Sequence, residues 1–393
     1  MLKIRTYNNI AEKGLQRFSA DNYAVSADLP DAAAILLRSE KLSSEIVTSQ
    51  LKAVARAGAG VNNVPVSDCT DAGVVVFNTP GANANAVKEL VLCGLLLGSR
   101  GILPGINYVS SLTDVTDYQE MSRLLESEKK RFKGAEIAGK TLGVIGLGAI
   151  GSMVAEMAIS MGMKVQGYDP ALSVEAAWRL PSQVKRNENV ISLISSSDFI
   201  SLHLPVLDST RGLINTDMFS AMRPGICLLN FSRDEIVDSD ALIAALDEGT
   251  LGKYISDFPR PDLINKENAI SMPHIGASTR EAEENCAVMA ADQLIDFLEN
   301  GNIKNSVNFP PLYLDRVIGA PKGTRLAIIN KNVPKMLGQI TAVLADQNIN
   351  VIDMLNKSRG EIAYNLIDME SAPSEDALAA IADIDDVIKV TLI

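Results

Sequence analysis

Histidine, tryptophan and cysteine are scarce in this chain, which has two histidines, one tryptophan and four cysteines among 393 residues. The cysteines lie far apart and form no C-x-x-C pair, so we expect buried, unpaired thiols and no metal site. They are Cys69, Cys93, Cys227 and Cys286. Basic residues are also few, 36 against 48 acidic ones, and the net charge is −12. This balance argues against nucleic acid as a partner, because nucleic-acid phosphates attract basic surfaces.

A long apolar run is missing as well. The N-terminus, MLKIRTYNNI, has no apolar core of the signal-peptide kind. The longest apolar run, near residues 90–98, is about half as long as a membrane span. We therefore expect no membrane segment and a cytoplasmic location. Hydrophobic residues make up 47% of the chain, and its length predicts about two to four domains.

Short apolar runs alternate with helical patterns as far as residue 301. Runs such as 32–38, 51–60 and 73–80 are apolar and end in Gly, Pro or Asn, which is typical of buried parallel strands. Helices are predicted over 85–100 and 281–301, and the polar, charged residues 110–137 predict an exposed connector helix and loop. A second alternation of strands and helices begins at Lys140. The pattern indicates two doubly wound α/β domains with parallel sheets, of the Rossmann or flavodoxin-like type.

A different order of elements follows a segment that contains proline and glycine. Over residues 324–393 the pattern is strand, helix, strand, strand, helix, strand. This βαββαβ order is that of a ferredoxin-like module. We expect a small C-terminal α+β domain joined by a linker at 311–323.

The sequence GLGAIG follows an apolar strand and opens a helical pattern. Its glycines, Gly146, Gly148 and Gly151, have the G-x-G-x-x-G spacing, and the next predicted strand ends at Asp169. Such a unit of about 30 residues binds the pyrophosphate of a dinucleotide at the helix N-terminus. Asp169 can accept hydrogen bonds from both adenosine ribose hydroxyls and would repel a 2′-phosphate, so the pattern predicts NAD rather than NADP.

A hydride-transfer enzyme needs a base for the hydroxyl proton of its substrate. His203, in SLHLP at a strand end, is interpreted as a histidine beside the cofactor. His274, in PHIGAST between a strand and a helix, is the candidate acid–base. Arg233 follows another predicted strand and could bind a substrate carboxylate with two hydrogen bonds. Asp257 and Asp262, in SDFPRPD, are candidate carboxylates, although each could equally be a surface charge.

These motifs occur in an order that resembles the D-isomer-specific 2-hydroxyacid dehydrogenases. The order is GLGAIG with Asp169, LHLP, NFSRDEIVD, SDFPRPD and PHIGAST. ARAGAGVNNV, FNTPGANANAVKEL and the C-terminal module narrow the likeness to the members that oxidise 3-phosphoglycerate, so it covers nearly the whole chain. The resemblance implies NAD-dependent oxidation of 3-phosphoglycerate to 3-phosphohydroxypyruvate, the first step of L-serine synthesis, in a homodimer or homotetramer.

The resemblance also implies a domain organisation and roles for individual residues. The substrate domain would be discontinuous, 1–93 with 282–310, around an NAD domain at 94–281. Arg233 would bind the substrate, His274 would be the acid–base, and Asp262, where the family usually has glutamate, would be its partner. Glu267 is a less favoured substitute for Asp262.

Further residues follow from the same likeness. The cofactor-binding candidates are Gly146, Gly148, Ala149, Ile150, Gly151, Asp169, His203, Leu204, Pro205, Ser232, Asp257, His274 and Gly276. The substrate-binding candidates are Arg56, Ala57, Gly58, Asn78, Lys130 and Arg233. Arg56 and the basic run around Lys130 are the candidate phosphate-binding cations.

The C-terminal module resembles an ACT domain, which often binds an amino acid between subunits. Asn330, Asn332 and Asn350 match the effector-binding positions, so the resemblance implies L-serine as an effector. Lys335 stands where such domains usually have glycine, and a domain with only a structural role is the alternative.

Two other functions stay open. A hydroxypyruvate, glyoxylate or 2-oxoglutarate reductase would share the chemistry without a phosphate site. An NAD-sensing co-repressor would share the scaffold, but it has no use for the C-terminal module.

Overall fold

A computed structural model describes residues 1–316 and 324–393, and the second half of the expected linker lies outside this range. The chain forms two compact units. The first combines residues 1–83 with 280–393, and the second comprises residues 84–279. The boundary expected at residues 93 and 94 falls inside helix α3 (Ala84–Ser99), whose apolar side packs in the core of the second unit.

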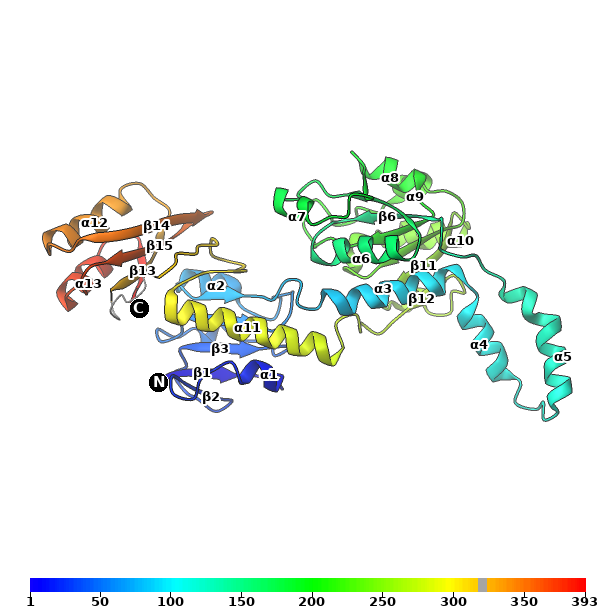
Figure 1. The fold of residues 1–393 in the computed structure, drawn as a ribbon, viewed down its shortest axis with the longest axis horizontal. Coiled ribbons are helices and arrows are strands. Elements are labelled where there is room, and N and C mark those ends of the chain that lie inside the picture. Colours follow the sequence, from blue (N-terminus) through cyan, green and yellow to red (C-terminus); the bar gives the residue numbers. More distant parts are fainter. Residues whose placement is uncertain (317–323) are drawn as a thin grey trace. The chain divides into compact units, whose positions relative to one another are not determined.

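The first unit contains a five-stranded parallel sheet with the order β2-β1-β3-β4-β5. Its strands are β1 (Leu2–Thr6), β2 (Tyr23–Ser26), β3 (Ala34–Leu37), β4 (Ala53–Arg56) and β5 (Val75–Phe77). Its helices are α1 (Glu12–Leu15), α2 (Val66–Asp71), α11 (Arg280–Asn300) and a short 3₁₀ helix (Ser44–Ile46). Helix α11 returns from the far end of the chain and lies across this sheet (Figure 1).

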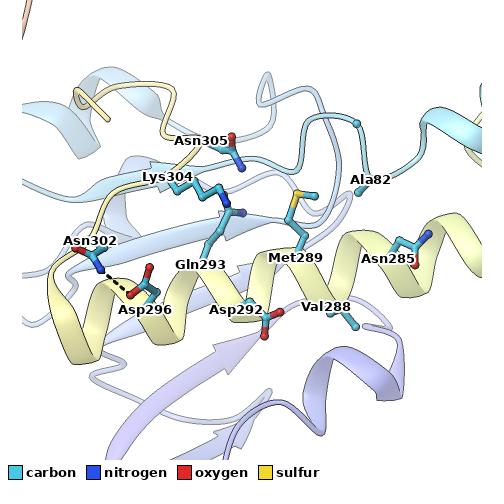
Figure 2. Close-up of a pocket in the computed structure, with 11 residues that line it drawn as sticks. Ala82, Asn285, Val288, Met289, Asp292, Gln293, Asp296, Asn302, Lys304 and Asn305 are labelled. Carbon is cyan, nitrogen blue, oxygen red and sulfur yellow. Dashed lines mark hydrogen bonds between the residues drawn. The ribbon is translucent and has the colours of Figure 1, made fainter. Parts of the chain in front are cut away.

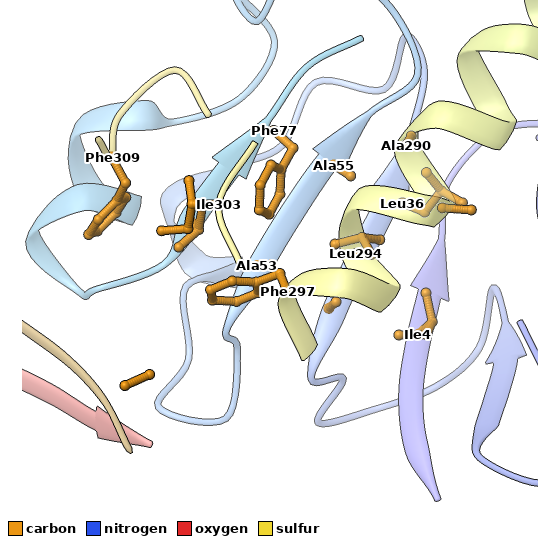
Figure 3. Close-up of a cluster of buried hydrophobic side chains, with 14 of the residues drawn as sticks. Ile4, Leu36, Ala53, Ala55, Phe77, Ala290, Leu294, Phe297, Ile303 and Phe309 are labelled. Carbon is orange, nitrogen blue, oxygen red and sulfur yellow. The ribbon is translucent and has the colours of Figure 1, made fainter. Parts of the chain in front are cut away.

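The side chains that hold α11 on the sheet are alanines and larger apolar residues of the helix, and they pack against branched and aromatic residues of the strands. Ala290 and Leu294 of α11 share a core with Leu36 and Phe77 of the strands, as Figure 3 shows. Burial of such apolar side chains contributes about 1.5–3 kcal/mol for each large one. The pairing of residues 1–83 with α11 therefore depends on packing between distant segments.

The C-terminal module has the predicted order and forms an antiparallel sheet, β14-β15-β13-β16. Its elements are β13 (Arg325–Lys331), α12 (Met336–Asp346), β14 (Val351–Arg359), β15 (Ile362–Met369), α13 (Glu375–Ala382) and β16 (Val387–Leu392). The alternation of side chains along β13 buries both faces of the sheet. Leu326 and Ile328 face the module's helices, whereas Ala327 and Ile329 join the core of the N-terminal sheet.

Arg325, which forms a buried ion pair inside the module, also attaches the module to the rest of the first unit. Arg325 is 0% exposed and donates two hydrogen bonds of 2.6 Å to the carboxylate of Asp368. The same guanidinium donates to the carbonyl of Asn300, at the end of α11, and to those of Leu314 and Asp315. The described half of the expected linker is thus packed and hydrogen-bonded.

The second unit contains a seven-stranded parallel sheet with the order β12-β11-β10-β9-β6-β7-β8. Its strands are β6 (Thr141–Ile145), β7 (Lys164–Tyr168), β8 (Lys185–Arg186), β9 (Phe199–Leu202), β10 (Ile226–Asn230), β11 (Leu251–Ser256) and β12 (Ala269–Ser271). Its further helices are α4 (Ile102–Ser111), α5 (Tyr118–Glu128), α6 (Ala149–Ser160), α7 (Val174–Trp178), α8 (Val190–Ser196), α9 (Thr216–Ser220), α10 (Ser239–Asp247) and 3₁₀ turns at Lys129–Phe132, Asp234–Ile236 and Pro261–Leu263. The predicted fold class, two doubly wound parallel sheets with a ferredoxin-like module, is confirmed.

One feature of the second unit differs from expectation. Cys93 is exposed, whereas the other three cysteines are buried as predicted. The segment 110–137, expected as an exposed connector helix and loop, contains α5 as that helix, and α4 lies mostly before it. Neither helix has a buried residue, and both extend away from the sheet (Figure 1). In the described residues no single helix is long and apolar enough to cross a membrane, although the bent pair α3–α4 reaches that length and composition together.

Candidate active site

The glycine turn lies where the strand order reverses. Strand β6 has β7 on one side and β9 on the other, and ligands of such sheets bind at the carboxyl ends of the strands at this point. Gly146 has a φ of 91°, and a Cβ there would lie 2.3 Å from the carbonyl oxygen of His203, which follows β9. A Cβ on Gly151 would lie 1.9 Å from the carbonyl oxygen of Gly146. Both positions therefore require glycine for the turn itself.

Gly148 behaves differently, because a Cβ at this position would meet nothing within 4 Å. It precedes α6, whose first residues are Ala149 and Ile150 and whose N-terminus has no side-chain cap. The open space lets an anion approach the backbone closely, and the free N–H groups at the helix N-terminus can donate hydrogen bonds to it. Asp169, at the end of β7, accepts a hydrogen bond of 2.8 Å from the backbone N–H of Leu147. These features fit a dinucleotide.

His203 lies beside this turn and is held in one orientation. Its Nε2 atom is 2.8 Å from the hydroxyl of Ser201, and burial lowers the pKa of His203 to about 3. Its buried Nδ1 atom has no hydrogen-bond partner among the described residues. Burial keeps this imidazole neutral and makes it a weak base, which fits the interpretation of His203 as a residue beside the cofactor.

Three more cofactor-binding candidates have local structural roles. A Cβ added to Gly146 would lie 3.0 Å from Cδ2 of Leu204, so these two residues are close together. The carbonyl of Pro205 accepts a hydrogen bond from Thr210, and the hydroxyl of Ser232 donates to Asn230. Asn230 was not selected from the sequence, although it opens the NFSRDEIVD motif.

His274 lies in a loop that buried Asp257 holds in place. Asp257 is 3% exposed, and its two oxygens accept hydrogen bonds from the backbone N–H groups of Ile275 and Gly276 at 2.7 and 2.6 Å. His274 has a left-handed backbone with a φ of 56°, and its ring lies 4.9 Å from that of Phe258. The loop therefore presents an exposed imidazole on a fixed backbone.

Asp262 is engaged by a residue that sequence reasoning missed. Two nitrogens of Arg260 donate to the carboxylate of Asp262, and this hydrogen bonding lowers the pKa of the carboxyl group. Among the described residues no hydrogen bond joins the His274 ring to a carboxylate. The signal available in the sequence was the R-P-D spacing in SDFPRPD. The pairing of Asp262 with His274 stays a prediction.

Arg233 lies at the carboxyl end of β10 in the same unit. Its side chain is exposed, donates 2.6 Å to the carbonyl of Ser232, and makes no ion pair within residues 1–316 and 324–393. Asn230 donates 2.8 Å to the backbone carbonyl of Arg233 and so fixes this turn. Arg233 therefore presents a guanidinium that is available to an anion.

The substrate-binding candidates of the first unit gather at the carboxyl ends of β4 and β5. Arg56 donates to the carbonyls of Arg38 and Gly60, and a Cβ on Gly58 would lie 2.6 Å from the Arg56 guanidinium. Asn78 donates 2.7 Å to the carbonyl of Ala59. The loop that starts at Arg56 and Ala57 and the loop that carries Asn78 thus form one structure.

Lys130 belongs to the second unit and lies in the exposed 3₁₀ turn after α5. Its neighbours Lys129 and Arg131 pair with glutamates of α5. The basic run is therefore partly neutralised by its own segment.

The effector candidates are engaged within the C-terminal module. Asn330 is 2% exposed, donates 2.7 Å to the carbonyl of Lys331, and accepts from Asn365. The side chain of Asn332 donates to the carbonyl of Gly360, whereas Asn350 is exposed at the start of β14. Lys335 has a left-handed backbone, with a φ of 76°.

Comparison with known proteins relates this geometry to a family. Residues 106–276 match the model of the D-isomer specific 2-hydroxyacid dehydrogenase, NAD binding domain. This range contains the glycine turn, Asp169, both histidines, Arg233 and the Asp257 loop.

Curated relatives extend the likeness beyond that domain. The chain is 33% identical over 365 residues to D-3-phosphoglycerate dehydrogenase of Haemophilus influenzae, covering 90% of this chain and 84% of the relative. It is 35% identical over 311 residues to the human D-3-phosphoglycerate dehydrogenase, covering 76% of this chain. The chain spans only 55% of the human protein's length.

A solved structure has a similar fold. The NAD⁺-bound 3-phosphoglycerate dehydrogenase of Entamoeba histolytica is similar with a TM-score of 0.61 and 28% identity, covering 78% of this chain and 98% of that one. With the match of the NAD binding domain and the extended identity to the Haemophilus protein, this shows that the chain belongs to the D-isomer-specific 2-hydroxyacid dehydrogenases.

Proposed function

We propose that the chain oxidises 3-phosphoglycerate to 3-phosphohydroxypyruvate with NAD. The observation that carries the proposal is the group of residues at the carboxyl edge of the second sheet: an open glycine turn, an exposed His274, and an Arg233 that makes no ion pair within the described part of the chain. The named relatives support the choice of a phosphorylated substrate. When bound, NAD supplies the hydride acceptor.

Arg233 binds the carboxylate and the C2 oxygen of the substrate, because its guanidinium has free donors in a planar fork. His274 removes the hydroxyl proton while the hydride leaves C2, so the alcohol becomes a ketone and the imidazole becomes an imidazolium. Asp257 keeps the His274 loop rigid through its two backbone hydrogen bonds. Asp262 stabilises the imidazolium, which requires its carboxylate to be shared with Arg260.

The proposed role of Asp262 has a direct test in the pH dependence of turnover. An imidazolium that loses a nearby anion becomes a stronger acid. Asp262→Asn should therefore lower the kinetic pKa of the acid–base group. A pH profile equal to that of the parent would remove Asp262 from the mechanism.

The phosphate of the substrate is assigned to Arg56. A dianion in an acidic chain needs fixed cations, and the loop of Arg56 is tied to that of Asn78. Arg56→Ala should reduce kcat/KM for 3-phosphoglycerate much more than for an unphosphorylated 2-hydroxy acid. Equal losses on both substrates would favour a hydroxypyruvate, glyoxylate or 2-oxoglutarate reductase, and NADH absorbance follows each reaction.

We also propose that the chain forms a homodimer through α4. Ile102, Ile106 and Val109 repeat at helical spacing on this helix and are 37%, 55% and 49% exposed. An apolar stripe of this kind on an otherwise acidic protein suits a second copy of the same helix. Ile106→Asp should yield a monomer in analytical ultracentrifugation, and an unchanged mass would contradict this interface.

The ACT-like module is proposed to bind L-serine and lower activity. Asn350 is exposed, but binding would have to displace the internal bond of Asn332. Calorimetry with L-serine tests this, and binding that weakens when substrate is present would show the reciprocal coupling expected of an effector. The cytoplasmic location expected from the sequence stays a prediction.

A further inference from the structure

A cavity of the first unit lies on α11, outside the residues proposed for catalysis. Its volume is about 670 Å³, within the size range of small-molecule sites. We call it the α11 groove and define it by Ala82, Met289, Gln293, Asp296, Lys304 and Asn305. Figure 2 shows Gln293 and Met289 rising from the helix toward the segment that carries Lys304 and Asn305.

Gln293 gives the groove a polar group that lacks a partner. The residue is 7% exposed, and its Nε2 atom donates 3.0 Å to the carbonyl of Asn78. Its Oε1 atom is buried and has no hydrogen-bond partner among the described residues. A buried acceptor without a partner costs about 1–3 kcal/mol, so a ligand or water that donates to it is stabilised.

The groove contains one charge of each sign that is available to a ligand. Oδ1 of Asp296 accepts from Asn300 and Asn302, and within residues 1–316 and 324–393 no partner reaches its Oδ2. Lys304 is exposed, and in the same ranges its ammonium makes no ion pair. The other acid of the cavity, Asp292, is already paired with Arg17.

The charges and the apolar part lie in sequence along the helix. In this view Asp296 is at one end, Gln293 and Lys304 are in the middle, and Met289 and Ala82 are at the other end (Figure 2). A dianion would be repelled by Asp296, and a simple amine would leave Lys304 without a counter-charge. A molecule with an ammonium, a carboxylate and an apolar tail satisfies all three parts.

We propose that the α11 groove binds an α-amino acid with an apolar side chain. Its ammonium donates to Asp296 and to Oε1 of Gln293, its carboxylate accepts from Lys304, and its side chain contacts Met289 and Ala82. The site is separate from the ACT-like module, whose candidate effector residues lie in β13, in the turn that follows it and at β14.

The groove is connected by hydrogen bonds to Asn78, a candidate substrate-binding residue. Gln293 holds the carbonyl of Asn78, and the carbonyl of Asn305 accepts from the backbone N–H of Asn78 at 3.4 Å. A ligand that reorients Gln293 or Asn305 would shift Asn78. This consequence rests on the proposed function: an occupied groove should change KM for 3-phosphoglycerate by about fivefold, the lower end of typical coupling, with kcat unchanged.

Calorimetry with the full chain and L-leucine tests binding without any turnover. Isoamylamine and isocaproate, which lack the carboxylate and the ammonium respectively, should each bind at least about tenfold more weakly, since each loses a charge-assisted hydrogen bond. No heat from L-leucine at millimolar concentration, or equal binding of isoamylamine, would overturn the proposal.

Two variants and a matched control assign the charges. Lys304→Met should bind L-leucine no better than isoamylamine, and Asp296→Asn no better than isocaproate. Lys41→Met, which removes an exposed lysine of the same unit, should bind as the parent does. Unchanged affinity in Lys304→Met with an unchanged melting temperature would also overturn it. If binding is present but 3-phosphoglycerate is not oxidised, the proposed function has failed and the groove has not.

Discussion

The nucleotide-binding turn and the C-terminal segment proposed to bind an effector both match short family motifs, but their residues have different structural roles in the fold. At the first, a Cβ on Gly148 would meet nothing within 4 Å, and the backbone is left open. At the second, the side chains of Asn330 and Asn332 already donate to carbonyls of the module. When a motif binds its ligand through backbone geometry, the sequence predicts the site well. When it binds through side chains, the prediction also depends on which partners those side chains have in the folded chain.

His274 gives the largest expected effect and tests the nucleotide-binding unit. His274→Ala should reduce kcat by about 10²–10⁴, the usual contribution of general acid–base catalysis. The binding of NADH should be retained, and quenching of exposed Trp178 in the same unit can follow it. A kcat within a few-fold of the parent would contradict the assignment of His274.

The glycines of the turn allow a sharper test, because two of them differ in a single respect. Gly151→Ala places a Cβ 1.9 Å from the carbonyl oxygen of Gly146, so we expect a loss of about 1–3 kcal/mol in the free energy of unfolding. Gly148→Ala should leave stability within about 0.5 kcal/mol, because its φ of −67° suits alanine and the space is open.

The affinity for NAD separates the two glycines in the opposite way. Gly148→Ala should bind NAD more weakly, because the new methyl group occupies the space where backbone and pyrophosphate approach each other. Urea denaturation measures the first effect and calorimetry the second. Equal NAD affinity in Gly148→Ala and the parent would mean that the open space is not the pyrophosphate site.

The sequence was sufficient for the elements of this turn because each part is local. An apolar strand, a glycine spacing and an acid at the next strand end are all visible along the chain. The pairing of Asp262 with Arg260 was missed although both residues lie in one motif, because the resemblance assigns the carboxylate to His274 and the side-chain directions depend on how the loop folds. The domain boundary was misplaced inside α3 for a similar reason: which core Val91 and Leu95 enter depends on segments far away in sequence.

The third prediction concerns the pH dependence of stability that His203 confers. Its folded pKa, about 3, lies below the ordinary value of 6.5 because burial disfavours the charged ring. The unfolded chain therefore binds more protons between these values, and stability falls as the pH drops from about 6.5 toward 3.

The comparison variant is His203→Gln, which can still reach the hydroxyl of Ser201 but does not titrate. At about pH 4.5 the parent should have lost about 2 kcal/mol more than this variant, relative to neutral pH. Urea denaturation at both pH values gives the difference. Parallel pH curves would mean that His203 is protonated in the folded chain without cost.

The smallest expected effect lies at Lys335, in the turn before α12. A left-handed φ of 76° brings the Cβ of a non-glycine residue close to its own backbone. Lys335→Gly removes that cost, although glycine also makes the unfolded chain more flexible, so we expect a net gain of about 0.5–1 kcal/mol in the free energy of unfolding. Gln339→Gly, at an exposed interior position of the adjoining helix α12, is the matched control and should lose a similar amount.

If Lys335→Gly is also destabilising, the turn is stabilised by contacts of the lysine side chain. If Lys335→Gly instead binds L-serine more tightly than the parent, the lysine side chain occupies space that the effector would use. This one side chain would then account for the difference between the two motifs.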